Sequence, residues 1–260
     1  MKVLDSFSLA GKVAVMTGGE GMYGRQAADA LHEAGAKLFI CSPLMDELQK
    51  AAEEMRAAGG DVTALYVDQG DEESILKLAD EIISIAGKVD VLINNAVTRP
   101  MSSYNGDSST FAESMKVNAT GLFLITRTFG NHMAKNSSGS IINIASIHGM
   151  IAPDPTLYEG LGMDGFVPDY FFHKAGMIHF TKFLASYYGS CGIRCNAISP
   201  GGLQSHRTSV EFVERYSKRT MLCRMAGQDD LKGAVLFLAS DASRYVTAVN
   251  LPVDGGYIAR

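Results

Sequence analysis

A tyrosine and a lysine four residues apart carry the strongest chemical signal in the sequence. Tyr170 and Lys174 open a helical pattern, and residues four apart in a helix share one face. An ammonium group one turn from a phenol would stabilise the phenolate. Tyr170 is therefore a candidate general base that removes a hydroxyl proton, and a general acid in the reverse direction. Ser146 closes the β-type run 141–146 upstream, so this strand end and the helix start can converge.

A glycine-rich turn predicts a second ligand. Residues 19–24 read Gly-Glu-Gly-Met-Tyr-Gly, between a strand-like and a helical run. Glycines let the backbone approach a pyrophosphate, which meets the free N–H groups at the helix N-terminus. The pattern therefore predicts a dinucleotide site.

The type of dinucleotide depends on the end of the second strand, which reads Cys41-Ser42-Pro43-Leu44. This stretch has no acid for the ribose hydroxyls of NAD and no arginine for the 2′-phosphate of NADP. An unpaired buried phosphate costs more than hydroxyls left to water, so NAD is slightly favoured over NADP. Arg25 could reverse this preference by swinging toward the phosphate.

The elements that must position these residues alternate between short β-type runs and helical patterns. Strands are expected at 12–17, 37–41, 62–67, 89–93, 140–145, 193–198 and 250–253, and helices at 22–34, 46–58, 71–86, 111–135, 170–188 and 229–239. This alternation predicts an α/β fold: one Rossmann-type, doubly wound parallel sheet of about seven strands with helices on both faces, forming a single domain over 1–260. Segments 151–169 and 201–226 interrupt the rhythm and are expected to be loops on the substrate side.

Composition narrows the class of protein. The chain has 260 residues, 47% of them hydrophobic, which excludes a disordered chain. A net charge of −5 gives no general attraction to nucleic acid or to an anionic membrane. We see no secretory signal and no apolar stretch of about 20 residues for a membrane helix. The four cysteines are too few for a disulfide scaffold. We expect a cytoplasmic protein with buried thiols, a small-molecule substrate and no metal site.

With further motifs in order, the chain from about 9 to 257 resembles the short-chain dehydrogenase/reductase family. The matching pieces are Thr17-Gly18 with Gly24, Asp68, Asn94-Asn95-Ala96, Asn118, Ser146, Tyr170, Lys174, 196–201 and 253–256. The resemblance implies an enzyme that transfers a hydride between NAD(P) and a secondary alcohol or ketone. It also implies a homotetramer or homodimer built on helices 111–135 and 170–188.

The resemblance assigns roles to individual residues. Tyr170 would be the general acid/base, Lys174 would hold the nicotinamide ribose and tune Tyr170, Ser146 would orient the reacting group, and Asn118 would hold a water in a proton relay. Besides Tyr170 and Lys174, the expected cofactor contacts are Thr17, Gly18, Gly19, Gly21, Met22, Tyr23, Gly24, Ser42, Asp68, Gln69, Asn95, Ala96, Pro200 and Gly201.

Three residues depart from the family pattern. Met22 stands where the middle glycine of the turn is usual, and we expect Gly21 to take over its role through a shifted turn. Val97 replaces a glycine beside the cofactor, and Ala248 replaces one near the C-terminus. A cofactor-binding regulator without turnover therefore stays an alternative, although all four catalytic positions are intact.

The substrate side holds several polar candidates. Arg99, His206 and Arg207 could converge on a carboxylate, phosphate or sulfonate, or they could be solvated loop charges. His148 could bond a polar substrate or be structural. His173 is expected on a different helical face from Tyr170, in a structural role.

The stretch from Ser146 to Tyr170 is about twice as long as is usual in the family. Its Tyr158 and Glu159 could contact substrate hydroxyls, or the stretch could be a surface or subunit-contact loop.

Within the family, the chain resembles sugar and polyol dehydrogenases of the gluconate 5-dehydrogenase kind and 3-oxoacyl carrier-protein reductases. The polar candidates favour a sugar, sugar acid or polyol. An acyl carrier protein would need a basic docking face, and helix 111–135 offers only Lys116, Arg127 and Lys135. A steroid-like or other hydroxy compound is a further alternative.

Overall fold

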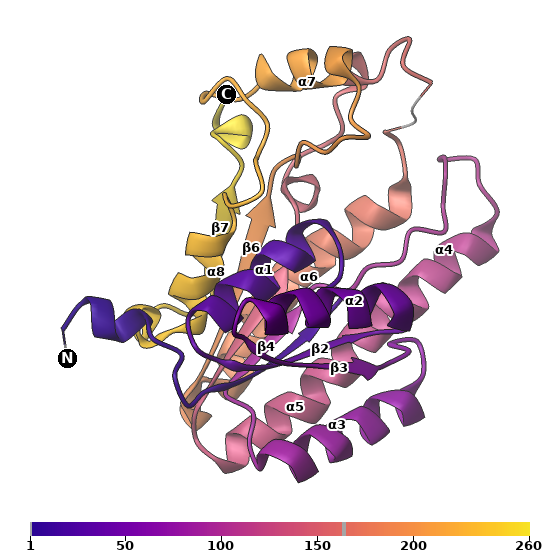
Figure 1. Cartoon of the computed structure of the whole chain (residues 1–260). Coiled ribbons are helices and arrows are strands. Elements are labelled where there is room, and N and C mark those ends of the chain that lie inside the picture. The colour runs from indigo at the N-terminus through magenta and orange to yellow at the C-terminus, as the bar shows by residue number, and fades with distance from the viewer. Residues whose placement is uncertain (1, 163–164) are drawn as a thin grey trace.

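Seven parallel strands form one sheet in the order β3-β2-β1-β4-β5-β6-β7, in a computed structural model that describes residues 2–162 and 165–260 (Figure 1). The strands are β1 (Val13–Thr17), β2 (Lys37–Ser42), β3 (Asp61–Tyr66), β4 (Val91–Asn94), β5 (Gly139–Ile144), β6 (Ile193–Pro200) and β7 (Asn250–Val253). The predicted doubly wound sheet is confirmed.

Helices cover both faces of the sheet (Figure 1). They are α1 (Met22–Glu33), α2 (Met45–Ala57), α3 (Glu72–Ala86), α4 (Ser108–Met115), α5 (Leu122–Lys135), α6 (Pro168–Tyr188), α7 (Val210–Ser217) and α8 (Lys232–Ala239). Strand side chains point alternately to opposite faces. Ala14 and Met16 therefore pack under α1, α2 and α8, whereas Val13 and Val15 pack against α3, α5 and α6.

Two predicted helix starts differ from the structure by three residues. The helix expected at 111–135 begins at Ser108, because the Asp107 side chain accepts the N–H of Ser109 as an N-terminal cap (2.8 Å). A π-helical turn, η2 (Lys116–Gly121), then separates α4 from α5. The last helix, α8, begins at Lys232, three residues later than the expected start at 229.

The prediction that 201–226 is a loop was wrong in its middle, where α7 forms. The Ser209 hydroxyl accepts the N–H of Phe212 (3.2 Å) and starts this helix. Phe212 and Tyr216 are four apart and buried on one face of α7. That spacing was the sequence signal for the helix.

The part of segment 151–169 around residues 154–159 packs on α7 and the turn after it. Its Leu157 and Tyr158 join Phe212 and Tyr216 in a small apolar cluster. The Arg215 guanidinium donates to the backbone carbonyl of Glu159 (2.7 Å) and to that of Thr156 (3.1 Å), and Arg219 pairs with Asp154 (2.6 Å). The two segments therefore form one unit beside α6. Figure 1 shows α7 at the top of the molecule, away from the sheet.

Two details of burial differ from what the sequence suggests. The spacing of Ile75, Leu78, Ile82 and Ile85 predicts one apolar stripe on α3; the first three are buried, but Ile85, in the last turn of the helix, is 51% exposed. All four cysteines are free, yet Cys223 is exposed, since it lies in the turn after α7 and outside the strands. None of the described helices is both long enough and apolar enough to span a membrane.

Candidate active site

The turns that follow β1 and β4 are joined at the point where the strand order reverses. Thr17 Oγ1 accepts the N–H groups of Asn95 (3.2 Å) and Ala96 (3.0 Å), and Asn95 Nδ2 donates to the Gly18 carbonyl (2.6 Å). Thr17 is fully buried, so its hydroxyl supports the two turns from below. Ligands of open α/β sheets bind in the crevice above such a point.

The glycine-rich turn fits a pyrophosphate. A Cβ on Gly24 would lie 1.9 Å from the Gly18 carbonyl oxygen, so only glycine lets α1 start this close to β1. No side chain caps the N-terminus of α1 at Gly21, and no atom beyond its chain neighbours lies within 4 Å of a Cβ built there. Free N–H groups facing open space form the usual anion site of a helix N-terminus. These residues therefore fit the predicted dinucleotide.

The expectation of a shifted turn at Gly21 was wrong. Gly21 is extended, with φ of −128°, whereas Met22 takes the left-handed conformation itself, with φ of 44°. This conformation costs a residue with a side chain on the order of 1 kcal/mol. The Met22 side chain is 60% exposed and that of Val97 is 39% exposed.

An acid does lie at the end of β2, although the sequence of that strand contains none. Ser42 Oγ donates to Glu20 Oε1 (2.9 Å), so the carboxylate comes from the turn after β1. The idea that Arg25 could turn to a phosphate is not supported, because Arg25 is bound to Asp29 (2.9 Å) and Glu54 (2.6 Å). The position of Glu20 inside the glycine pattern was the available signal.

Asp68 and Gln69, two of the expected cofactor contacts, lie just after the end of β3. Asp68 is exposed, and its Oδ1 accepts the N–H of Gly70 (2.8 Å). Gln69 is buried, and its Nε2 donates to the Val117 carbonyl (3.0 Å). Its Oε1 has no hydrogen-bond partner among the described residues, so it is available as an acceptor for a ligand.

The end of β5 and the start of α6 converge, as the sequence predicted. Lys174 is buried, and its ammonium donates to the carbonyl of Ile144, the last residue of β5 (2.6 Å). The Lys174 Nζ lies 5.8 Å from the ring centroid of Tyr170. Burial, and then the charge of Arg99, lower the pKa of Lys174 to about 7. Ser146 is also buried, and its Oγ accepts the N–H of His148 (3.1 Å).

The Asn118 side chain is fully occupied by local bonds. Its Oδ1 accepts the Thr98 N–H (3.0 Å), and its Nδ2 donates to the Thr98 carbonyl (2.8 Å) and to Ser114 Oγ (2.9 Å). Asn118 lies within the π-helical turn η2, a type of interruption frequent at functional sites. The amide therefore fixes the segment that leads to Arg99.

Basic and aromatic groups surround the Tyr170 phenol. The Arg99 guanidinium carbon lies 4.5 Å from the Tyr170 ring centroid. The His148 ring stacks on Phe171 (4.7 Å between centroids). Burial, and then the charge of Arg99, lower the pKa of His148 to about 4.

The prediction that His173 faces away from Tyr170 was wrong. The two rings meet edge to face, 5.3 Å apart between centroids, because residues three apart in a helix are neighbours. Both ring nitrogens of His173 are buried and lack a partner among the described residues. Burial, and then the charges of Lys174 and Arg99, lower the pKa of His173 to about 3. The His173 side chain is therefore uncharged where it packs against Tyr170.

Comparisons with known proteins agree with this geometry. The family model described as enoyl-(acyl carrier protein) reductase matches residues 21–258. This chain belongs to the short-chain dehydrogenase/reductase family. It is an NAD(P)-dependent oxidoreductase that acts on CH–OH groups.

Three similar proteins illustrate the range of the family. A 3-oxoacyl-(acyl-carrier-protein) reductase of Aquifex aeolicus is 33% identical, covering 95% of this chain and 98% of the relative. A 2-dehydro-3-deoxy-D-gluconate 5-dehydrogenase of Dickeya dadantii is 31% identical, covering 99% and 100%. A solved gluconate 5-dehydrogenase of Burkholderia cenocepacia, in complex with NADP and tartrate, has a TM-score of 0.89 at 28% identity, with all of both chains covered.

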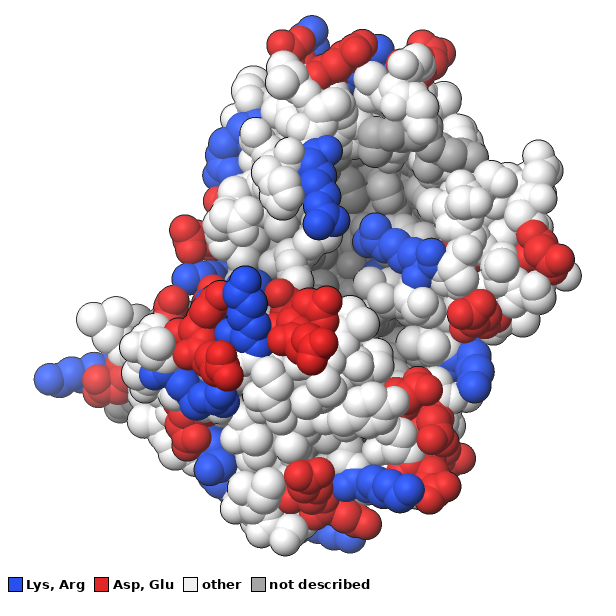
Figure 2. Space-filling model, turned by 45° about the vertical axis from the view of Figure 1, so that its right-hand side comes forward, with Lys and Arg blue, Asp and Glu red and all other residues white. Residues whose placement is uncertain are grey.

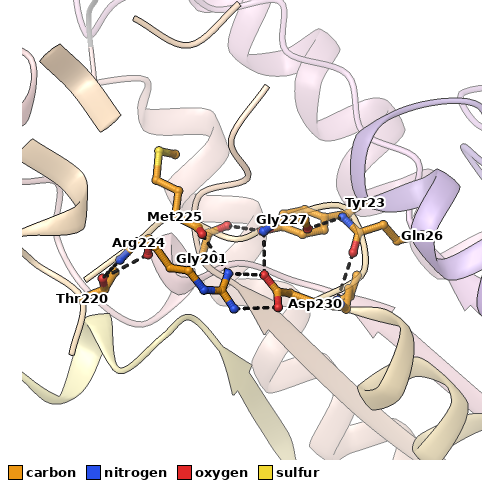
Figure 3. Close-up of polar contacts among 9 residues, drawn as sticks. Tyr23, Gln26, Gly201, Thr220, Arg224, Met225, Gly227 and Asp230 are labelled. Carbon is orange, nitrogen blue, oxygen red and sulfur yellow. Dashed lines mark hydrogen bonds and ion pairs between the residues drawn. The ribbon is translucent and has the colours of Figure 1, made fainter. Parts of the chain in front are cut away.

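In this dehydrogenase, segment 201–226 is tied to α1 (Figure 3). Pro200 ends β6, and the Tyr23 hydroxyl donates to the carbonyl of the next residue, Gly201 (3.0 Å). Gln26 Nε2 donates to the Gly227 carbonyl (3.1 Å). At the end of the segment, Arg224 forms a two-bond ion pair with Asp230 (2.5 and 2.8 Å). The glycine turn and this segment are therefore held as one wall of the cleft.

The remaining substrate candidates divide into two groups. His206, Arg207 and the Glu159 side chain are exposed, and no contact with Arg99 is formed by these described side chains. Tyr158 is half-buried and packs against Phe212 (5.7 Å between ring centroids); burial, and then the charges of Asp154 and Tyr170, raise its pKa.

Figure 2 shows a hollow below the top of the molecule, with Lys or Arg side chains at its rim. The described residues contain no group of three His, Cys, Asp or Glu side chains that could hold a metal.

Proposed function

We propose that this dehydrogenase interconverts a secondary alcohol and a ketone on a sugar acid, with a sugar or a polyol as the wider class. The Arg99 guanidinium carries the proposal, since it lies against the Tyr170 ring and pairs with no acid among the described residues. A planar cation without a counter-charge suits a carboxylate. The two relatives named for gluconate derivatives support this substrate class.

Each catalytic side chain has a defined task in the proposal. Tyr170 takes the proton from the substrate hydroxyl during oxidation and returns it during reduction. Lys174, held by the Ile144 carbonyl, stabilises the phenolate with its charge. Ser146 orients the reacting oxygen, and Asn118 holds a water for proton exchange. The nicotinamide of the bound cofactor accepts or supplies the hydride.

A 3-oxoacyl thioester is the second candidate, favoured by the Aquifex aeolicus relative. Docking of an acidic carrier protein would use free cations on α4, η2 and α5. Arg127 is already paired with Glu72 (2.6 Å). The sugar acid is therefore the better supported substrate.

We further propose that the enzyme is a homotetramer or homodimer. Phe123 of α5 is 43% exposed, and Phe183 and Tyr187 of α6 are 57% and 63% exposed. A continuous aromatic face of this kind usually marks a protein interface. We also propose that the whole chain acts as one cofactor-binding domain in the cytoplasm, where four free thiols are stable.

Turnover on a substrate panel tests the function. The purified enzyme is assayed with each cofactor and gluconate-type acids, matched neutral sugars, polyols and a 3-oxoacyl thioester. We expect the acids to give the highest kcat/KM, and Tyr170→Phe to lose activity by about 1,000-fold or more while binding cofactor normally. Turnover of the thioester alone would contradict the proposed substrate class.

A further inference from the structure

The Glu20 carboxylate lies at the carboxyl end of β2 because the turn after β1 is packed onto that strand. A Cβ on Gly19 would lie 2.7 Å from Cγ2 of Ile40, so the turn approaches β2 as closely as glycine allows. The next residue, Glu20, is thereby carried to Ser42, whose hydroxyl donates to Oε1 (2.9 Å). The contact joins two segments 22 residues apart in sequence.

One of the two carboxylate oxygens is left without a donor. Oε2 of Glu20 is buried and has no partner among the described residues. Ser42 cannot serve it as well, because its single proton is already given to Oε1 and its oxygen accepts the Leu44 N–H (3.2 Å). A buried polar oxygen without a donor is costly, so a ligand with hydroxyl donors would be held here.

The position defines which hydroxyls these are. Glu20 lies inside the turn whose N–H groups fit a pyrophosphate, and on its β2 side. In a nicotinamide dinucleotide the adenosine ribose is attached directly to the pyrophosphate, and it carries its 2′- and 3′-hydroxyls on the far edge. A carboxylate is the group that binds such a diol.

The surrounding charges are unsuitable for a phosphate at the same place. Arg25, the nearest arginine in sequence, is bound to Asp29 and Glu54. Pro43 and Leu44, which follow Ser42, carry no charge. A 2′-phosphate would therefore meet the Glu20 carboxylate with no compensating cation among these residues, and like charges repel strongly at short range.

We infer that Glu20 binds the adenosine ribose hydroxyls and excludes a 2′-phosphate, and that Ser42 holds its carboxylate in place. The inference deepens the proposed function, because it rests on a dinucleotide occupying this cleft. It makes NAD the cofactor of this enzyme. The selecting acid then comes from the β1–α1 turn, and β2 contributes only the serine that orients it.

Direct binding tests the inference without any substrate. NADH and NADPH are titrated against the wild-type enzyme, Glu20→Gln and Ser42→Ala by nicotinamide fluorescence, and 5′-AMP and 2′,5′-ADP are compared as competitors. Glu20→Gln keeps the shape of the side chain and removes its negative charge. Ser42→Ala keeps the Glu20 carboxylate and removes the hydroxyl that donates to it. The thermal midpoint of each protein without ligand reports whether it is folded.

We expect the wild-type enzyme to bind NADH on the order of 100-fold more tightly than NADPH. In Glu20→Gln the ratio should fall to within about tenfold, through weaker NADH and stronger NADPH binding, while Ser42→Ala should weaken NADH binding by a few-fold and keep the discrimination.

Equal or preferential NADPH binding by the wild type would overturn the inference alone. Equal weakening of NADH and NADPH binding in Glu20→Gln would also overturn it, because that result is expected if Glu20 only supports the turn. Failure of both cofactors to bind the wild type would overturn the proposed function as well.

Discussion

The guanidinium of Arg99 lies over the aromatic ring of Tyr170, with the guanidinium carbon 4.5 Å from the ring centroid. One cation therefore acts on two partners at once. It can bind an anionic substrate beside the acid/base group, and its charge reaches Lys174 behind it.

Replacement of Arg99 by alanine should separate binding from chemistry. A charge-assisted hydrogen bond is worth roughly 1.5–3 kcal/mol, so KM for a sugar acid should rise by about 10- to 100-fold in Arg99→Ala. KM for the matched neutral polyol should change little. Steady-state kinetics on the two substrates measure this difference. Arg207→Ala, in an exposed loop, is the matched control, and an equal effect of that variant would contradict the role of Arg99.

The same variant should alter the pH profile. Burial and the charge of Arg99 lower the pKa of Lys174 to about 7, and removal of that charge should raise it. The Lys174 ammonium would then persist to higher pH, and the alkaline limb of log kcat/KM for the neutral substrate should move upward in pH. Arg99→Lys, which keeps the charge, should leave that limb in place.

Two histidines, the buried His173 and the half-buried His148, should make the fold sensitive to acid. The pKa of His148 is lowered from 6.5 to about 4, and that of His173 from 6.5 to about 3. Between these values and pH 6.5 the histidines of the unfolded chain bind protons that those of the folded chain do not. The contribution of the neutral histidines to the free energy of unfolding is therefore fully present above pH 6.5 and is lost as the pH is lowered toward 4. Urea unfolding at pH 7 and pH 5 measures the loss. His148→Gln should reduce it, whereas His206→Gln, on an exposed loop, should not.

Ala248 should be a point of local strain. Its φ is 63°, a left-handed conformation that costs a residue with a Cβ about 1–2 kcal/mol. Glycine avoids this cost, but its larger conformational entropy in the unfolded chain offsets part of the gain. Ala248→Gly should therefore stabilise the protein by roughly 0.5–1 kcal/mol in urea unfolding. The control is Ala112→Gly, in the exposed face of α4, which should destabilise it by about 1 kcal/mol. Destabilisation by both changes would refute the strain.

The sequence predicted the sheet, the helices that flank it and the approach of the start of α6 to the end of β5, because these depend on local periodicity and on the short reach of βα turns. It failed where contact is made by segments far apart in the chain. Glu20 lies inside the glycine pattern, but its approach to the end of β2 depends on the packing of Gly19 on Ile40, and no local sequence pattern indicates that packing.

Two smaller features were missed for different reasons. The contact of His173 with Tyr170 follows from their spacing of three residues, because residues three apart are neighbours on the surface of a helix. The start of α7 at Ser209 was hidden inside a polar stretch that resembles a loop.

Arg215 holds residues 156–159 through the main-chain carbonyls of Thr156 and Glu159. Every amino acid has that carbonyl, so these two hydrogen bonds do not depend on the side chains of Thr156 and Glu159. Glu159 can change its side chain freely while this clamp persists. A lineage, or a designer, could therefore vary the chemistry offered to the substrate one residue at a time, without refolding the wall that presents it.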